Sequence, residues 1–167
     1  RFTKSVDKIQ IRKKKGLSKE NFVILRTARL SAEKSHADFL NVFKLVNEAV
    51  PHSRYLIAGS GPQRAKLIHI IKKLGLTDSV ILLGERDDIE DLNAISDLAF
   101  VRGFGTESLE HLCAGIPVCS FDSDGAHEII QHGNNGFLFQ FTETTRMSKA
   151  IIGLAKNRQK LDAMRKA

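Results

Sequence analysis

The stretch RGFGTESLEHLCAGIPVC, residues 102–119, decides the fold that the rest of the chain is expected to take. Residues 98–101 before it are apolar, as in a buried strand. Gly103 and Gly105 then permit a tight turn in which the backbone can come close to a ligand. Thr106 is expected to cap the helix that follows. A strand, a glycine turn and a helix in this order bring free N–H groups and the positive end of the helix dipole to one point, which is how many proteins bind phosphate.

Several groups of this stretch are candidates for ligand contacts. Gly103, Phe104, Gly105 and Thr106 would present backbone N–H groups to a sugar or a phosphate. Glu110 lies about one turn inside the predicted helix, where its carboxylate could accept hydrogen bonds from the vicinal hydroxyls of a ribose, as the acidic residue of dinucleotide-binding folds does. The alternatives are a glycine turn that serves only helix packing and an exposed helix carboxylate without a ligand.

The same alternation of strands and helices runs through the chain. Apolar runs predict strands at residues 23–25, 55–58, 80–83, 98–101, 118–121 and 137–139. Helical spacing predicts helices at about residues 36–50, 62–75, 89–96, 106–114 and 143–156, with another beginning at 161–167. This pattern predicts an α/β fold: a Rossmann-like domain of three layers, with a parallel sheet of about six strands and helices on both faces. In such a sheet the ligand crevice lies at the carboxyl ends of the strands.

Length and composition are those of one globular domain. With 167 residues, of which 42% are hydrophobic and 27% charged, the chain is long enough to bury a single core. Residues 1–20 are expected to form a linker and a leading helix. No apolar run reaches the ~20 residues that cross a bilayer. The two cysteines, Cys113 and Cys119, are expected to be reduced thiols, as in a cytosolic protein.

The net charge of +7 indicates an anionic partner or ligand. Much of the excess lies near the ends, at residues 12–15 and at Arg158, Lys160, Arg165 and Lys166. We interpret these residues as solvated helix faces, with contact to an anionic membrane surface as the second interpretation. No aromatic residues alternate with the basic ones, so no nucleic acid is expected as a partner. The six histidines have no metal-ligand spacing and are expected at surface or cap positions, which predicts no metal site.

Several of these stretches resemble segments of one family. Residues 103–118 fit the pattern G-F-G-x-x-x-L-E-x-x-x-A-G-x-P-V, which resembles the donor-binding motif of family 4 retaining glycosyltransferases, enzymes of the two-domain GT-B fold. Residues 29–34, 59–62 and 125–138 are similar, in kind and order, to three further segments of that family. The resemblance covers residues 23–139. It implies that the chain is the C-terminal, donor-binding half of a GT-B enzyme.

The resemblance also implies roles for individual residues. Arg29 and Lys34 would be catalytic, because they would grip the diphosphate of a nucleotide-sugar donor and stabilise the departing nucleoside diphosphate. Cations held in place in this way lower the barrier without a metal. Gly59 and Gly61 would approach the donor. The alternative is that they only form a tight turn, with Pro62 at the first helical position. Arg86 would contact the nucleobase.

Partners and a place in the cell follow from the same resemblance. The full-length enzyme would transfer a sugar, with retention of anomeric configuration, to a glycan or lipid-linked acceptor held by an N-terminal domain that this sequence lacks. The donor would be a nucleoside-diphosphate sugar, with no metal and no other cofactor, and the isolated domain would be inactive. The protein would be cytoplasmic, with peripheral contact to the inner face of the membrane.

The motif departs from the family at its start. Arg102 stands where the family usually has a glutamate, and the family places a longer connection between the strand and the turn. Consecutive Cα atoms are only ~3.8 Å apart, so Val101 and Arg102 have little reach toward the crevice. We therefore expect that these two residues are not neighbours in the natural protein and that a mobile sugar-binding loop is missing between them.

Two alternatives to a glycosyltransferase stay open at this point. One is half of a nucleotide-sugar epimerase, which shares the GT-B architecture and would act on the donor alone. The other is a non-catalytic basic α/β module that binds nucleic acid or anionic lipid. Binding of such a module to a long polyanion would weaken steeply with salt, whereas binding of one diphosphate would not.

Overall fold

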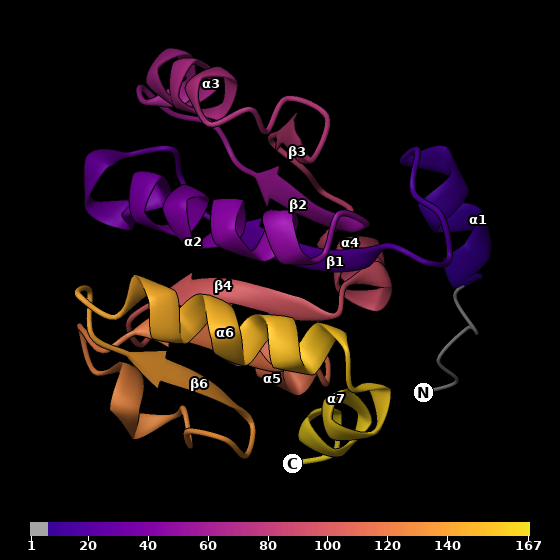
Figure 1. The fold of residues 1–167 in the computed structure, drawn as a ribbon, viewed down its shortest axis with the longest axis vertical. Helices are drawn as coiled ribbons and strands as arrows, with labels where there is room; N and C mark the ends of the chain where they lie inside the picture. Colours follow the sequence, from indigo (N-terminus) through magenta and orange to yellow (C-terminus); the bar gives the residue numbers. More distant parts are fainter. Residues whose placement is uncertain (1–6) are drawn as a thin grey trace.

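A parallel sheet of six strands forms the centre of the molecule (Figure 1). The computed structural model describes residues 7–167. The strands are β1 (Phe22–Thr27), β2 (Ser53–Ala58), β3 (Val80–Gly84), β4 (Leu98–Arg102), β5 (Val118–Phe121) and β6 (Gly136–Phe139), and their order in the sheet is β3-β2-β1-β4-β5-β6. The predicted parallel α/β fold is confirmed, and the predicted linker at residues 1–6 lies outside the described residues.

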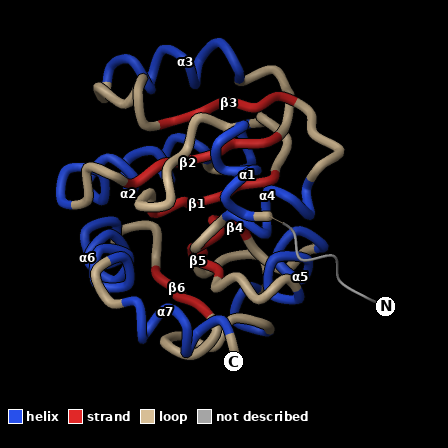
Figure 2. Tube along the Cα trace, turned by 90° about the vertical axis from the view of Figure 1, so that its right-hand side faces the viewer, coloured by secondary structure: helices blue, strands red, loops and turns tan. Residues whose placement is uncertain are grey.

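Helices cover both faces of the sheet (Figure 2). One face carries α2 (His36–Ala49), α3 (Arg64–Lys73), α6 (Thr144–Ala155) and α7 (Arg158–Arg165), which share one apolar cluster. The other face carries α1 (Lys8–Lys14), α4 (Ile89–Ile95) and α5 (Thr106–Cys113). Two short 3-10 turns, η1 (Ala32–Lys34) and η2 (Ala126–Glu128), lie in the loops after β1 and β5. The three predicted layers are therefore present.

The central strand β1 shows why the strands are continuous apolar runs in the sequence. Ile24 packs into the cluster beneath α2 and α6, whereas Val23 and Leu25 pack into the cluster beneath α4, and all three are fully buried. A strand that is covered on both faces does not show the alternation of a half-exposed one. Arg26 is the exception, since it is charged and also fully buried, on the same face as Ile24.

The order of the strands places a ligand crevice at β1. From β1 the chain adds β2 and β3 on one side and then β4, β5 and β6 on the other. In doubly wound sheets the crevice lies at such a switch point, outside the carboxyl ends of the strands. These ends point to the left in Figure 1, so the loops after β1, β2 and β4 lie on that side.

Two helices begin at other residues than predicted. The residue in the cap position of α5 is Gly105, not Thr106, and its N–H donates to the Ser108 hydroxyl at 3.1 Å. The extended backbone ends at Gly105, so Thr106 is already helical. Helix α3 begins at Arg64 and not at Pro62, because Pro62 lies in a turn that precedes the helix.

Strand β4 runs through Val101 and Arg102 without a break, which contradicts the expected missing loop. Both residues pair with β5. The short connection suffices because Arg102 is itself the last strand residue, so the turn begins only at Gly103, whose φ is +74°. The Phe104 N–H then donates to the Asp124 carbonyl at 2.7 Å and closes the turn against the loop after β5.

Some of the basic residues near the chain ends bind one buried carboxylate. Asp97, immediately before β4, is 3% exposed and accepts hydrogen bonds from Arg12 of α1 at 3.2 Å and from Arg165 of α7 at 3.1 Å. The Arg158 guanidinium lies 3.6 Å from the same carboxylate. The interpretation as solvated helix faces is thus wrong for Arg12 and Arg165. Through their hydrogen bonds to Asp97, Arg12 holds α1 and Arg165 holds α7 at the amino edge of the sheet, opposite the crevice.

Candidate donor site

A cation and the glycine turn meet in one pocket at the carboxyl edge of the sheet. Lys34 ends the 3-10 turn after β1, and its Nζ lies 3.4 Å from the Glu107 Oε1 in the first turn of α5. Both side chains are 30% exposed. The pocket has a volume of about 120 Å³ and is lined by Lys34, Val101, Arg102, Phe104, Gly105, Thr106, Glu107 and Ser108. The structure therefore brings together Lys34 and the turn that the sequence singled out.

Buried groups hold the loop that carries Lys34. Arg26 is fully buried, and its Nη2 donates to the Lys34 carbonyl oxygen. Its guanidinium lies 4.5 Å from the centroid of the Phe39 ring. His36 Nε2 donates to the Arg29 carbonyl oxygen at 2.8 Å. These two hydrogen bonds thus hold the loop at Arg29 and at Lys34.

His36 is a neutral donor in this position. Burial and, after it, the charge of the nearby Arg26 guanidinium lower its pKa to about 4. Because a carbonyl oxygen only accepts, the proton of the imidazole sits on Nε2. The prediction of a surface or cap histidine is wrong here, since His36 is 3% exposed and holds the loop of the candidate site.

Arg29 does not share the pocket of Lys34. Its side chain is exposed, on the loop between β1 and the 3-10 turn, and it is not among the residues that line the pocket. The two predicted cations therefore lie on one loop, but only Lys34 faces the glycine turn.

Gly59 and Gly61 are needed where two loops touch. Their φ angles are +144° and +157°, a region that favours glycine. A Cβ atom at Gly59 would collide with the Ala28 carbonyl oxygen, and one at Gly61 with that of Leu30. The Leu30 N–H also donates to the Ser60 carbonyl at 2.9 Å. The close approach of these two loops alone explains the two glycines, and a contact with the donor stays a prediction.

The turn after β4 is held by the loop after β5. Arg102 Nε lies 3.4 Å from Asp124 Oδ2, and its guanidinium lies 5.8 Å from the Phe141 ring centroid. A Cβ atom at Gly103 would lie 2.6 Å from the Cβ of Asp124, so only glycine fits there. At the position where the family that this chain resembles usually has a glutamate, this chain has Arg102, which is paired with Asp124.

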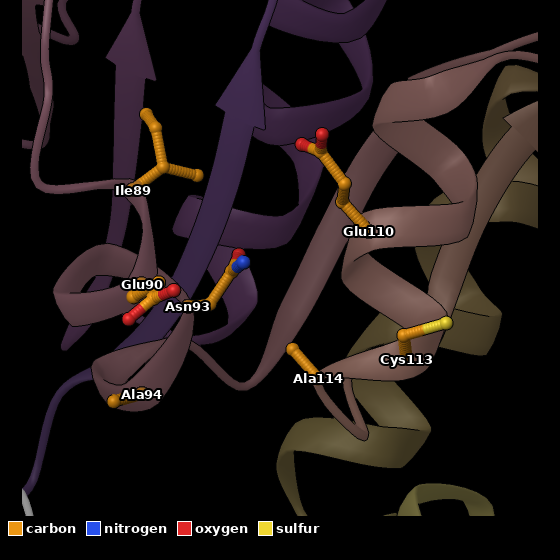
Figure 3. Close-up of a pocket in the computed structure, with 7 residues that line it drawn as sticks. All are labelled: Ile89, Glu90, Asn93, Ala94, Glu110, Cys113 and Ala114. Carbon is orange, nitrogen blue, oxygen red and sulfur yellow. The ribbon is translucent and has the colours of Figure 1, made fainter.

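A larger groove runs between α4 and α5, next to this turn (Figure 3). Its volume is about 610 Å³, and its lining residues are Ile89, Glu90, Asn93, Ala94, Glu110, Cys113 and Ala114. Glu110 is exposed in this groove, and its contact with a ligand stays a prediction. A groove of this size is within the range of small-molecule sites, about 300–1,000 Å³.

Arg86 is not part of the groove. Its Nε and Nη2 donate to the two carboxylate oxygens of Asp88 at 2.8 and 2.7 Å. Lys15 Nζ donates to the same carboxylate at 2.9 Å. These hydrogen bonds, that of Arg86 first, lower the pKa of Asp88. The structure thus places Arg86 in the loop between β3 and α4, bound to Asp88, and a nucleobase contact from it stays a prediction.

Sequence analysis missed a buried chain of hydrogen bonds behind the groove. The Asn93 Oδ1 lies 2.8 Å from His111 Nδ1, and His111 Nε2 lies 3.1 Å from Thr27 Oγ1. His111 is fully buried, and this burial, followed by the charge of Arg26, lowers its pKa to about 4. The one signal in the sequence was a polar residue, Asn93, on the apolar side of the predicted helix, beside Leu92.

Both cysteines are free thiols, as predicted: Cys113 is exposed in the groove, and Cys119 is buried in β5. Burial raises the pKa of the Cys119 thiol. Within residues 7–167, no group of three or more His, Cys, Asp or Glu side chains is arranged to hold a metal ion. In the same part of the chain, no helix combines the length and the apolar character of a bilayer crossing.

Comparison with known proteins agrees with this architecture. The family model described as Glycosyl transferases group 1 matches residues 7–167. N-acetyl-alpha-D-glucosaminyl L-malate synthase of Bacillus anthracis is 29% identical over 158 residues, which are 92% of this chain and 41% of that protein. Poly(glycerol-phosphate) alpha-glucosyltransferase of Bacillus subtilis is 31% identical over 144 residues, 83% of this chain and 21% of that protein. The chain thus spans less than half the length of these relatives.

A solved structure has the same fold. The Anabaena protein Alr3699/HepE in complex with UDP superposes with a TM-score of 0.87 and 27% identity, over 98% of this chain and 46% of that one. With a family model matching all the described residues and a parallel sheet that superposes on this structure, the chain belongs to the group 1 glycosyltransferases.

Proposed function

We propose that this domain binds a nucleoside-diphosphate sugar at the carboxyl edge of its sheet, with the diphosphate at Lys34 and the glycine turn and the nucleoside in the groove between α4 and α5. The observation that carries the proposal is the meeting of Lys34 with the turn of residues 103–106 in one pocket beside the groove that contains Glu110. The similarity to a protein solved with UDP supports it.

The chemistry of the leaving group explains the choice of residues. A glycosyl donor loses a nucleoside diphosphate, and negative charge grows on the diphosphate as the bond to the sugar breaks. Lys34, Arg29 and the backbone N–H groups at the start of α5 would stabilise that charge, the task that a metal ion performs elsewhere. Arg29 would have to turn toward the diphosphate from its exposed position, and it offers a bidentate contact where Lys34 offers a point charge.

The nucleoside would lie in the groove, with its ribose hydroxyls donating to Glu110. Ionised carboxylates only accept hydrogen bonds, and they suit a pair of vicinal hydroxyls. Phe104 and Leu109, which are 51% and 40% exposed, leave apolar surface at the mouth of the crevice for the donor or for another domain to cover.

The full-length protein would transfer the sugar to a glycan or a lipid-linked acceptor with retention of configuration. The part of the relatives that this chain does not cover would hold the acceptor, and the present domain alone would bind the donor without transferring sugar. The two free thiols support a cytoplasmic location, where contact with the inner face of the membrane would bring a lipid-linked acceptor within reach.

Thermal unfolding of the chain with UDP, GDP, ADP and inorganic pyrophosphate tests the proposal. A nucleoside diphosphate at about 100 times its Kd adds about 2.7 kcal/mol to the free energy of unfolding, and pyrophosphate at the same concentration adds less because it leaves the groove empty. Stabilisation by no nucleotide, or equal stabilisation by pyrophosphate, would contradict the proposal. A nucleotide-sugar epimerase would differ further, since its full-length form would convert the donor without any acceptor.

A further inference from the structure

Arg102 is a second cation in the pocket of Lys34. Both residues line the pocket at the glycine turn, whereas Arg29 does not. Arg102 is the last residue of β4 and pairs with Phe121 of β5, so the sheet holds its backbone, while Arg29 lies exposed on a loop. A side chain that extends from a strand is positioned more precisely than one on a loop. The pocket therefore offers an anionic ligand two cations, Lys34 and Arg102.

The guanidinium of Arg102 is only weakly bound within the domain. Its Nε lies 3.4 Å from Asp124 Oδ2, and the Asp124 side chain is 64% exposed. An ion pair with an exposed carboxylate contributes little to stability, because water competes for both partners. Within residues 7–167, the buried Nε forms no hydrogen bond. Arg102 can therefore exchange Asp124 for an acceptor that binds a guanidinium better, such as a phosphate.

A buried guanidinium next to the pocket adds to the positive charge. Arg26 is fully buried, and in the described part of the chain its Nε and Nη1 have no hydrogen-bond partner. Burial lowers the pKa of Arg26, and the nearby charge of Arg102 acts in the same direction. The two arginines thus repel each other across a poorly screened interior. An anion beside Arg102 would offset this repulsion.

The sheet separates Arg102 from the groove. Side chains alternate along a strand, so Arg102 extends on the same face as Phe100, which packs beneath α2 and α6. Its guanidinium lies 5.8 Å from the ring centroid of Phe141, just before α6, which agrees with that side. The groove lies between α4 and α5, which cover the opposite face (Figure 2). A nucleotide whose nucleoside fills the groove would meet the start of α5 with its first phosphate and Arg102 with its second.

We propose that Arg102 binds the phosphate of the donor that carries the sugar, as the second cation of the site beside Lys34. Negative charge grows on this phosphate as the bond to the sugar breaks, and a guanidinium can donate two parallel hydrogen bonds to its oxygens. Arg102 thereby supplies the contact that Arg29 could make only after turning into the pocket. The inference rests on the proposed donor site and names a contact within it.

Calorimetric titration with UDP and UMP tests the inference, because UMP lacks the second phosphate. Arg102→Gln is expected to weaken the binding of UDP at least about tenfold, or about 1.4 kcal/mol, and that of UMP less than about twofold. Arg102→Lys keeps the charge without the planar fork and should lose less affinity for UDP. Arg54→Gln, the same change on a half-buried arginine near the start of β2, should leave both affinities unchanged.

A second variant keeps the test decisive if Arg102→Gln does not fold. Asp124→Asn removes the carboxylate that competes with the phosphate for Arg102. Asparagine accepts the φ of +50° at this position as readily as aspartate does, so the backbone is not strained by the change. The variant should bind UDP more tightly, by up to about fivefold, and should bind UMP as the parent does.

Failure of the inference and failure of the proposed function are distinct results. A parent that binds no nucleotide contradicts both. Equal losses of affinity for UDP and UMP in Arg102→Gln, or no loss for either, overturn only the role of Arg102. An Asp124→Asn variant that binds UDP no more tightly than the parent overturns that role as well.

Discussion

Lys34 and Glu107 form an ion pair across the mouth of the candidate donor site, with Nζ and Oε1 3.4 Å apart. Glu107 therefore offsets the charge of Lys34 beside the glycine turn. A diphosphate at this turn has to replace the Glu107 carboxylate as the partner of Lys34, and it is repelled by that carboxylate at the same time. Glu107 should thus weaken the binding of the donor, while it keeps Lys34 in place when the site is empty.

Replacing this carboxylate is expected to tighten binding. Half-buried and exposed ion pairs contribute about 0.2–1 kcal/mol, so Glu107→Gln should lower the Kd for a nucleoside diphosphate by up to about fivefold. Calorimetric titration measures the change. Glu48→Gln removes a comparable ion pair on α2, away from the crevice, and should leave the Kd unchanged. Weaker binding by Glu107→Gln would show that Glu107 supports the ligand.

Removing the cations should weaken binding. Hydrogen bonds to charged groups contribute about 1.5–3 kcal/mol, so Lys34→Ala should cost that much of the affinity for the diphosphate, and Arg29→Ala as much if it turns toward the ligand. Lys44→Ala on α2 is the matched control. An affinity of Lys34→Ala equal to that of the parent would refute the placement of the diphosphate, and an unchanged affinity of Arg29→Ala would remove only Arg29 from the site.

The carboxylate at the opposite edge should matter for stability and not for binding. Asp97 holds Arg12 and Arg165 from two different helices, and breaking a buried ion pair on one side costs about 3–5 kcal/mol. Asp97→Asn should therefore lower the free energy of unfolding in urea by about 3 kcal/mol, while the exposed Asp87→Asn changes it little. A loss below about 1 kcal/mol would contradict this, because it would mean that water replaces Asp97 as the partner of the two arginines at little cost.

Stability should depend on two buried histidines as the pH falls. Burial lowers the folded-state pKa of His36 and His111 to about 4, from an ordinary value of 6.5. The unfolded chain therefore takes up these protons first, so this stability is fully present above about pH 6.5 and is lost toward pH 4. Each histidine contributes a slope of up to about 1.4 kcal/mol per pH unit.

Urea unfolding at several pH values between 4.5 and 7.5 measures this slope. The His36→Gln variant should lose about half of it, whereas the exposed His69→Gln should keep all of it. A free energy of unfolding that stays constant from pH 6.5 to 4.5 in the parent would contradict the assignment of neutral, buried histidines.

The sheet and part of the site could be predicted from the sequence because each leaves a local pattern. Strands such as β1 and β5 are short apolar runs, since both of their faces are covered. Lys34 and Glu110 lie in segments that carry recognisable motifs, and the structure places both of them in cavities at the carboxyl edge.

The rest depends on contacts between distant elements, which leave no pattern. His111 and Asn93 are joined only because α4 and α5 lie side by side, and nothing in the spacing of either helix indicates that bond. Arg26 is a buried charged residue in a strand, where an apolar residue is expected. Its role follows from its hydrogen bond to the Lys34 carbonyl, which joins two separate elements. The short link at Arg102 was misread because the strand continues one residue further than its apolar run.

The most direct test of the account is the amide NMR spectrum of the chain during titration with UDP, because it reports binding and its location together. The account predicts saturable shifts at Lys34, at Gly103 and Gly105 of the turn, and at the side-chain amide of Asn93. Residues around Asp97 at the opposite edge should not shift. Saturable shifts confined to that basic edge, or no shifts at millimolar UDP, would contradict the claim that this crevice is the donor site.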